Sequence, residues 1–168
     1  MAKAEINGVY TLECFRNGTK MWSETAENLT TNEGLDRLLN VNFHGATQIA
    51  TWYCGLVESD TTAAAAMTYD VPVFTECTAY DEATRPEYVE AESTARSTTN
   101  SANKAVFTMS ATKTIYGAFL TSVATKGDHA AGANNVLHSY AKLGSSRSTV
   151  DNDVLNLTYT ETAADDGV

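Results

Sequence analysis

Stretches in which hydrophobic and polar residues alternate recur along this chain, and the clearest two lie near its start. Residues 9–15 and 19–23 alternate with a period of two, which places successive side chains on opposite faces of a strand. Asn17 and Gly18 stand between them, and both tolerate the positive φ angles that a tight type I′ turn requires. The pattern predicts a β-hairpin.

Similar short patterns follow, separated by turn-forming segments. The predicted strands cover residues 48–57, 74–78, 88–95, 105–110, 114–122, 136–140 and 154–160. Polar turns are predicted at residues 97–103, 126–128 and 144–146. Many short strands at this spacing are typical of sandwiches and barrels. We therefore expect a mainly β fold, a single-domain antiparallel β-sandwich of the jelly-roll or immunoglobulin-like type.

One segment has a helical period instead. Thr30 and Glu33 have the spacing of a capping box, in which each side chain satisfies a free backbone N–H of the first turn. Leu35, Leu38 and Leu39 follow at helical spacing. The sequence predicts one short helix that ends near residue 40 and plugs one end or one face of a sheet.

Residues 1–8 show no periodicity, so we expect an N-terminal arm ahead of a single domain at residues 9–168. An unstructured arm can order against a neighbouring protein by adding a strand to its sheet. Arginine and tyrosine are enriched in protein interfaces, and Arg85 is expected in a loop because Pro86 follows it. The candidate partner contacts are Ala2, Lys3, Ile6, Tyr80 and Arg85.

The charge balance narrows the range of partners. The 168 residues include 11 Lys and Arg against 21 Asp and Glu, a formal net charge of −10. Phosphate backbones repel such a surface, so nucleic acid is not an expected partner. No apolar run reaches the roughly 18 residues of a membrane helix, and the first residues lack the apolar region of a secretory signal. We expect synthesis in a cytoplasm and no membrane partner.

The residues that most often carry chemistry do not form a recognisable constellation in the sequence. Cys14, Cys54 and Cys77 lack metal-ligand spacing with any histidine, and we expect buried thiols. The three histidines are isolated: His44, His129 and His138. A lone histidine is more often a hydrogen-bonded or surface residue than a ligand or base. No metal or cofactor is expected.

Three further patterns resemble catalytic or binding motifs but lack essential parts. Gly127 and Gly132 have phosphate-loop spacing, yet no Lys and Ser or Thr follow. The acidic pairs at residues 90/92 and 151/153 share a strand face, where a solvated surface is the ordinary explanation. No Gly-x-Ser-x-Gly elbow occurs. We expect no catalytic residues and no enzyme activity.

Five segments together form a recognisable pattern. They are Asn-Leu-x-Thr-Asn-x-Gly-Leu at 28–35, Trp-Tyr-x-Gly-Leu at 52–56, Thr-Glu-x-x-x-Tyr at 75–80 with Arg-Pro at 85–86, Gly-x-Phe-x-x-Ser at 117–122, and Asp-x-Leu-x-x-Thr-Tyr at 153–159. In the residues of these segments and in their order, the chain resembles the small virion structural proteins of tailed bacteriophages. Asn152 stands where the pattern usually has Gly, and residues 140–143 match it poorly.

The resemblance implies a capsid decoration (cement) protein made in the bacterial host and bound to the outer capsid surface of the virion. Its expected partners are the major capsid protein and further copies of itself, as a dimer or trimer. Two alternatives stay open. One is a tail, fibre or head–tail component, and the other is a carbohydrate-binding adsorption module that exposes Trp22 or Trp52.

Overall fold

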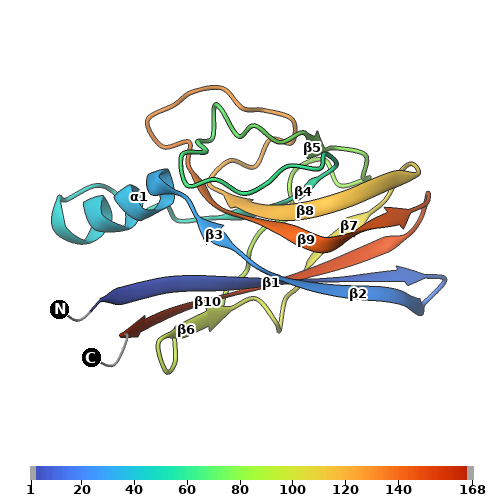
Figure 1. Ribbon diagram of the computed structural model, residues 1–168, viewed down its shortest axis with the longest axis horizontal. Helices are drawn as coiled ribbons and strands as arrows, with labels where there is room; N and C mark the ends of the chain where they lie inside the picture. Colours follow the sequence, from blue (N-terminus) through green and yellow to red (C-terminus); the bar gives the residue numbers. More distant parts are fainter. Residues whose placement is uncertain (1–2, 166–168) are drawn as a thin grey trace.

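The computed structural model describes residues 3–165 as two antiparallel β-sheets packed face to face, with a helix at one end (Figure 1). Sheet A contains β2 (Thr19–Glu27), β1 (Ala4–Arg16) and β10 (Val154–Asp165), and β10 also pairs with β6 (Ser97–Thr99) and β7 (Ala105–Thr108). Sheet B runs in the order β3 (Leu29–Thr30), β9 (Leu137–Thr149), β8 (Lys113–Thr121), β4 (Tyr53–Val57) and β5 (Glu76–Cys77). The mainly β sandwich predicted from the sequence is confirmed.

Strands from the first part of the chain pair with strands from the last part in reverse order. β1 pairs with β10, β3 with β9, and β4 with β8, all antiparallel. The first and last strands therefore lie side by side in the middle of sheet A. In a constant-type immunoglobulin domain, by contrast, the first and last strands belong to different sheets.

The predicted hairpin is present as β1 and β2. Asn17 and Gly18 have φ angles of 50° and 77°, the left-handed values that a type I′ turn requires at both positions. Alternate residues of β1 face the core, as the pattern predicts: Tyr10, Leu12 and Cys14 are fully buried between the sheets.

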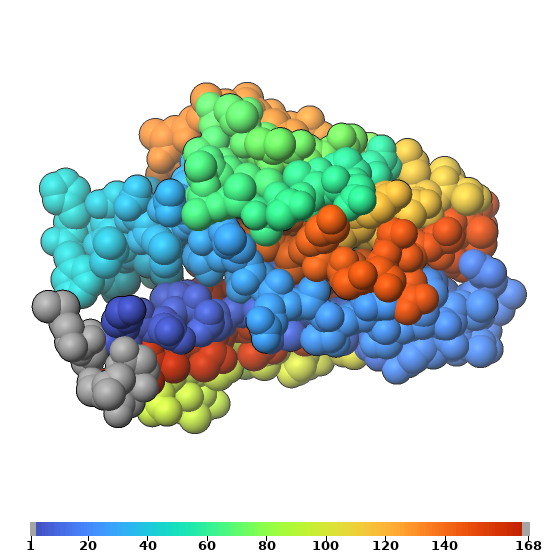
Figure 2. Space-filling view, in the orientation of Figure 1, coloured from blue at the N-terminus to red at the C-terminus, as the bar shows by residue number. Residues whose placement is uncertain are grey.

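Hydrophobic side chains gather on both faces of sheet B. One cluster fills the space between the sheets. A second cluster lies on the outer face of sheet B, and its buried members are Val57, Met67, Tyr69, Phe74, Phe119, Leu137 and Tyr140. The segments before β5 and before β9 cover that face (Figures 1 and 2). Because loops cover it, β8 and the start of β9 are buried on both sides.

Two details show how closely the core packs, and the second was expected. Gly55 allows a close approach, since a Cβ there would lie 2.2 Å from the ring of Phe119. Cys14, Cys54 and Cys77 are free and buried, and burial raises the pKa of the Cys14 thiol to about 12. Asn152 adopts φ 65°, the left-handed conformation that the pattern's usual Gly would supply.

Other predictions at this level are wrong. Residues 4–8 are not an arm, because they belong to β1 and pair with the end of β10, from Ala4 opposite Asp165 to Gly8 opposite Glu161. Residues 144–146 are not a turn but continue β9, while β6 forms where a polar turn was expected. Residues 48–52 precede the strand that was predicted to contain them, because β4 begins at Tyr53.

Candidate partner-binding surface

Helix α1 (Asn32–Phe43) is fixed to sheet B at its first turn. Thr31, not Thr30, is the N-cap, and its hydroxyl accepts a hydrogen bond from the Gly34 N–H. The Glu33 carboxylate accepts hydrogen bonds from the backbone N–H groups of Leu137 and Tyr69, at 2.7 and 2.9 Å. Gly34 lies against β9, where a Cβ would come within 2.5 Å of a backbone oxygen.

Beyond that first turn the helix leaves the sheets. Gly34 is its buried residue, and α1 projects from one end of the sandwich (Figure 1). Leu35, Leu39 and Phe43 are 37%, 57% and 84% exposed. A spacing of four residues places them on one face of the helix. We call these three residues the α1 stripe.

A cleft lies between α1 and the segment that leads into β4. Its outer hollow, about 310 Å³, and its inner hollow, about 190 Å³, adjoin each other. Five residues line both hollows: Leu38, Gln48, Ile49, Trp52 and His138. The inner hollow reaches sheet A, where Glu161 on β10 lines it. We call the two hollows together the α1 cleft.

A buried polar network forms the floor of this cleft. His138 Nε2 lies 2.8 Å from one oxygen of Glu161, and the Tyr159 hydroxyl donates to the same carboxylate at 3.2 Å. Asn28 links the network to β1, because its side chain donates to the Tyr159 hydroxyl and accepts from the Gly8 N–H. Burial raises the pKa of Tyr159 well above its ordinary value. The network joins the two sheets and holds Glu161 in place.

Arg85, predicted as a partner contact, is instead a buried structural residue. It is 1% exposed and donates two hydrogen bonds to the Glu76 carboxylate, at 2.8 and 2.7 Å. Its remaining donors reach the backbone oxygens of Val123 and Asp128. The guanidinium thus ties the loops over sheet B together and leaves nothing for a partner.

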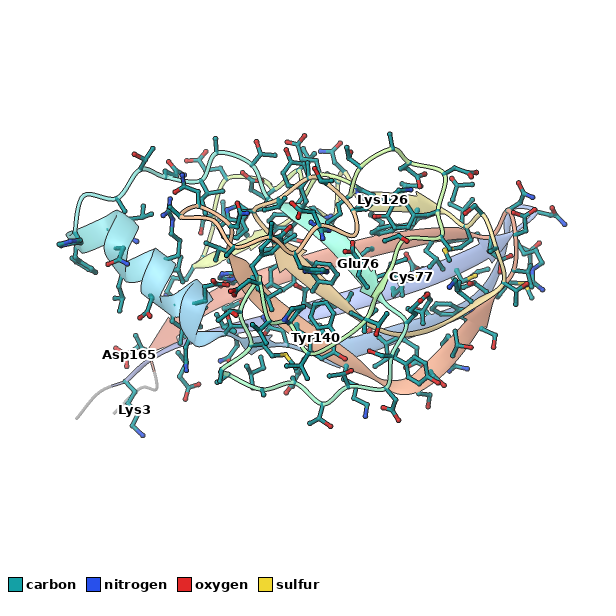
Figure 3. All side chains as sticks on the ribbon, turned by 90° about the horizontal axis from the view of Figure 1, so that it is seen from above. Lys3, Glu76, Cys77, Lys126, Tyr140 and Asp165 are labelled. Atoms are coloured by element: carbon teal, nitrogen blue, oxygen red, sulfur yellow. The ribbon has the colours of Figure 1, made fainter. Side chains whose placement is uncertain are left out.

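Tyr80, also predicted as a contact, is 2% exposed and packs edge-on against Phe107. Lys3 is exposed and Ile6 is half-buried in β1. Lys3 lies at the same end of the molecule as α1, as does Asp165 (Figure 3). Ala2 lies outside the described residues.

The α1 stripe was not predicted as a surface, because Leu35 and Leu39 were expected to face the sheet. One signal in the sequence points to it: Phe43 continues the four-residue spacing beyond the expected end of the helix at residue 40. A helix longer by one turn extends past the sheet that anchors its start.

Among residues 3–165, His, Cys, Asp and Glu side chains do not gather in groups of three or more that could hold a metal ion. The described part of the chain also contains no helix that is long and apolar enough to cross a membrane. Neither a scan against protein-family models nor a search of curated proteins finds a match for this chain.

Proposed function

We propose that this chain is a virion structural protein of a tailed bacteriophage, a capsid decoration protein that binds the outer shell through its α1 end. The resemblance described above supports the virion role. The observation that carries the binding surface is the α1 stripe, three large apolar side chains aligned on one face of a projecting helix.

Single exposed apolar residues are ordinary on protein surfaces, whereas contiguous apolar patches mark interaction sites. The stripe and the α1 cleft share one helix but different sides of it, because Leu38 lines both hollows and Leu35, Leu39 and Phe43 line neither. A protruding helix beside a hollow suits binding of an amphipathic surface, in which large apolar side chains serve as anchors.

The net charge supports a place on the outside of the shell. A chain of charge −10 is repelled by packaged DNA. The mechanism would be linkage, because a protein that binds the assembled shell and not its separated subunits stabilises the shell by mass action. Many copies of a modest interface suffice.

The first test of the virion role uses purified phage particles. Quantitative mass spectrometry would give the copy number of this chain relative to the major capsid protein. A ratio near one, or a simple fraction of it, is expected for a lattice-bound decoration protein. A handful of copies per particle would move the protein to the tail or the head–tail junction, and absence from particles would refute the virion role.

The second step tests the surface. Purified chain is added back to shells that lack it, and occupancy is measured by co-sedimentation. The double substitution Leu39→Ser with Phe43→Ser should abolish binding. Met21→Ser is the matched control, because Met21 is 47% exposed and lies on β2 instead of α1. Equal occupancy for both variants would show that α1 is not the contact.

A further inference from the structure

The inner hollow of the α1 cleft combines apolar walls with a set of hydrogen-bond acceptors. Leu38, Ile49, Trp52 and Leu120 provide the walls. Glu161, Glu90 and Thr98 provide side-chain oxygens. At about 190 Å³, the space suits one long side chain and not a helix or strand.

One hydroxyl in this hollow is poorly paired. Tyr88 is 5% exposed and lines the hollow, and its buried hydroxyl makes no hydrogen bond of normal geometry among the described residues. Burial raises the pKa of Tyr88, the Thr98 side chain lowers it as a hydrogen-bond partner does, and the charges of Glu161 and Glu90 raise it. The hydroxyl is therefore beside the acceptors of the hollow. A buried polar group without a partner is costly, so a group that enters and bonds to it gains affinity.

Two carboxylates line the inner hollow. They are Glu161, which is paired with His138, and Glu90, while Arg37 lines the outer hollow only and donates a hydrogen bond to the backbone oxygen of Thr47. The Glu161 carboxylate already accepts from His138 and Tyr159. A carboxylate has about four lone-pair sites, so it retains capacity for another donor.

We propose that the inner hollow of the α1 cleft receives a lysine or arginine side chain of the protein partner. Such a side chain has an apolar stem that suits Leu38, Ile49 and Leu120, and a head that only donates hydrogen bonds. The indole of Trp52 adds a ring against which the cation packs. A carboxylate or phosphate would be repelled by Glu161 and Glu90.

This inference rests on the proposed function in naming the source of the side chain, and it refines the contact. The α1 stripe would pack on apolar surface of the partner while the basic side chain fills the hollow on another side of the same helix. Arginine is enriched among hot-spot residues that fill well-packed pockets from which water is excluded.

The test needs no capsid. Because the chain has two tryptophans, Trp22 and Trp52, labelling with 5-fluorotryptophan gives two fluorine resonances that Trp22→Phe assigns. The labelled protein is titrated with the N-acetyl amides of lysine and arginine. The Trp52 resonance should shift saturably with one or both of these, and the Trp22 resonance should stay unchanged. The N-acetyl amide of norleucine, which has the stem without the charge, should bind about tenfold more weakly or not at all.

Glu90→Gln and Tyr88→Phe should each weaken the response, and both leave the His138–Glu161 pair intact. Glu92→Gln is the matched control, since Glu92 is exposed and does not line the hollow. Three outcomes overturn the inference: no saturable shift with either cation, an equal shift with norleucine, or a shift with methyl glycosides and not with cations. The last of these would favour a glycan site. Failure of the shell-binding test with a positive titration would refute the capsid partner and leave the hollow's specificity standing.

Discussion

The loops over sheet B and the α1 end both contain residue types that favour binding. The fold buries and pairs them in the loops, and it leaves them exposed on α1. Arg85 is 1% exposed, and its donors are paired with Glu76 and backbone oxygens. Phe43 is 84% exposed, whereas Tyr80 and Tyr88 both have buried hydroxyls without a hydrogen bond of normal geometry. Exposure, and not residue type, therefore separates the candidate contact Phe43 from the structural residue Arg85.

The largest effect on stability is expected from breaking the buried ion pair between Arg85 and Glu76. Arg85→Met removes the guanidinium from the buried Glu76 carboxylate, which keeps its contacts with His129 and the Gly127 N–H, and removing one partner of a buried pair costs about 3–5 kcal/mol. The free energy of unfolding in urea measures this loss. Arg147→Met is the control, because Arg147 is 40% exposed and pairs with Glu24, and surface pairs contribute about 0–1 kcal/mol.

A double variant sharpens the result. Arg85→Met with Glu76→Leu removes both charges, so it should be more stable than Arg85→Met alone. If the two variants unfold at the same urea concentration, the isolated carboxylate is not the cause, and the pair does less than the geometry indicates.

The next largest effect is expected at the base of α1. Gly34→Ala places a Cβ within 2.5 Å of the His138 oxygen on β9, so the helix must move away. Such overpacking costs about 1–3 kcal/mol, and hydrogen exchange of the α1 amides should accelerate. Gly144→Ala is the control, because a Cβ there meets no atom within 4 Å. Unchanged exchange in α1 would mean that the helix is not anchored through Gly34.

The two regions also differ in the titration of one glutamate each. Burial raises the pKa of Glu76, but hydrogen bonds from His129 and Arg85 outweigh it and hold the pKa below 4.5. Burial raises the pKa of Glu33 above 4.5, although backbone N–H groups of Leu137 and Tyr69 lower it. Carboxyl carbon shifts in an NMR titration should therefore show Glu33 protonating at higher pH than Glu76.

The consequences for stability have opposite signs. The unfolded chain protonates Glu76 first, so its contribution to stability is present above about pH 4.5 and is lost as the pH falls through the lower folded value. The folded chain protonates Glu33 first, so its contribution grows as the pH falls toward 4.5. A reversed order of the two titrations would contradict both statements.

The smallest effect on stability is expected on the α1 stripe itself. Leu39→Ser and Phe43→Ser remove exposed side chains, and exposed substitutions usually change stability by less than about 0.5 kcal/mol. Leu12→Ala, in the core, should cost about 2–5 kcal/mol and provides the scale. A large loss from Phe43→Ser would mean that the stripe is packed against the protein's own surface.

Local sequence patterns correctly predicted the elements that depend only on residues close together in the sequence. The turn at Asn17 and Gly18 needs only its own φ angles, and the alternation that follows from residue 9 identifies the core face of β1. The strand at residues 4–8 was missed because its alternation is short: Ile6 and Gly8 face inward, but Glu5 and Asn7 between them are exposed and Gly8 adds no apolar side chain. Its partner strand lies at the other end of the sequence.

The site was less predictable than the fold. Whether Leu39 faces a sheet or solvent depends on where α1 leaves β9, which no spacing within the helix reveals. Arg85 was placed on the surface because Pro86 indicates a loop, but Glu76 and two further loops enclose it.

The segments that carry the phage resemblance are mostly structural. Asn28 joins β1 to β10, Glu76 and Arg85 fix the loops, and Asp153 accepts two hydrogen bonds from Arg16. The α1 stripe beyond Leu35 lies between these segments. The proposed resemblance therefore rests on residues that build the sandwich, and not on Leu39 or Phe43.

The pairing of β1 with β10 also sets the order in which the protein can fold during synthesis. β1 can pair with β2 as soon as both have left the ribosome, but its second neighbour, β10, is made more than a hundred residues later. Contacts of such large sequence separation are slow to form. One edge of the β-hairpin therefore stays unpaired until β10 has been made, and an unpaired strand edge is a template for wrong pairing with another chain.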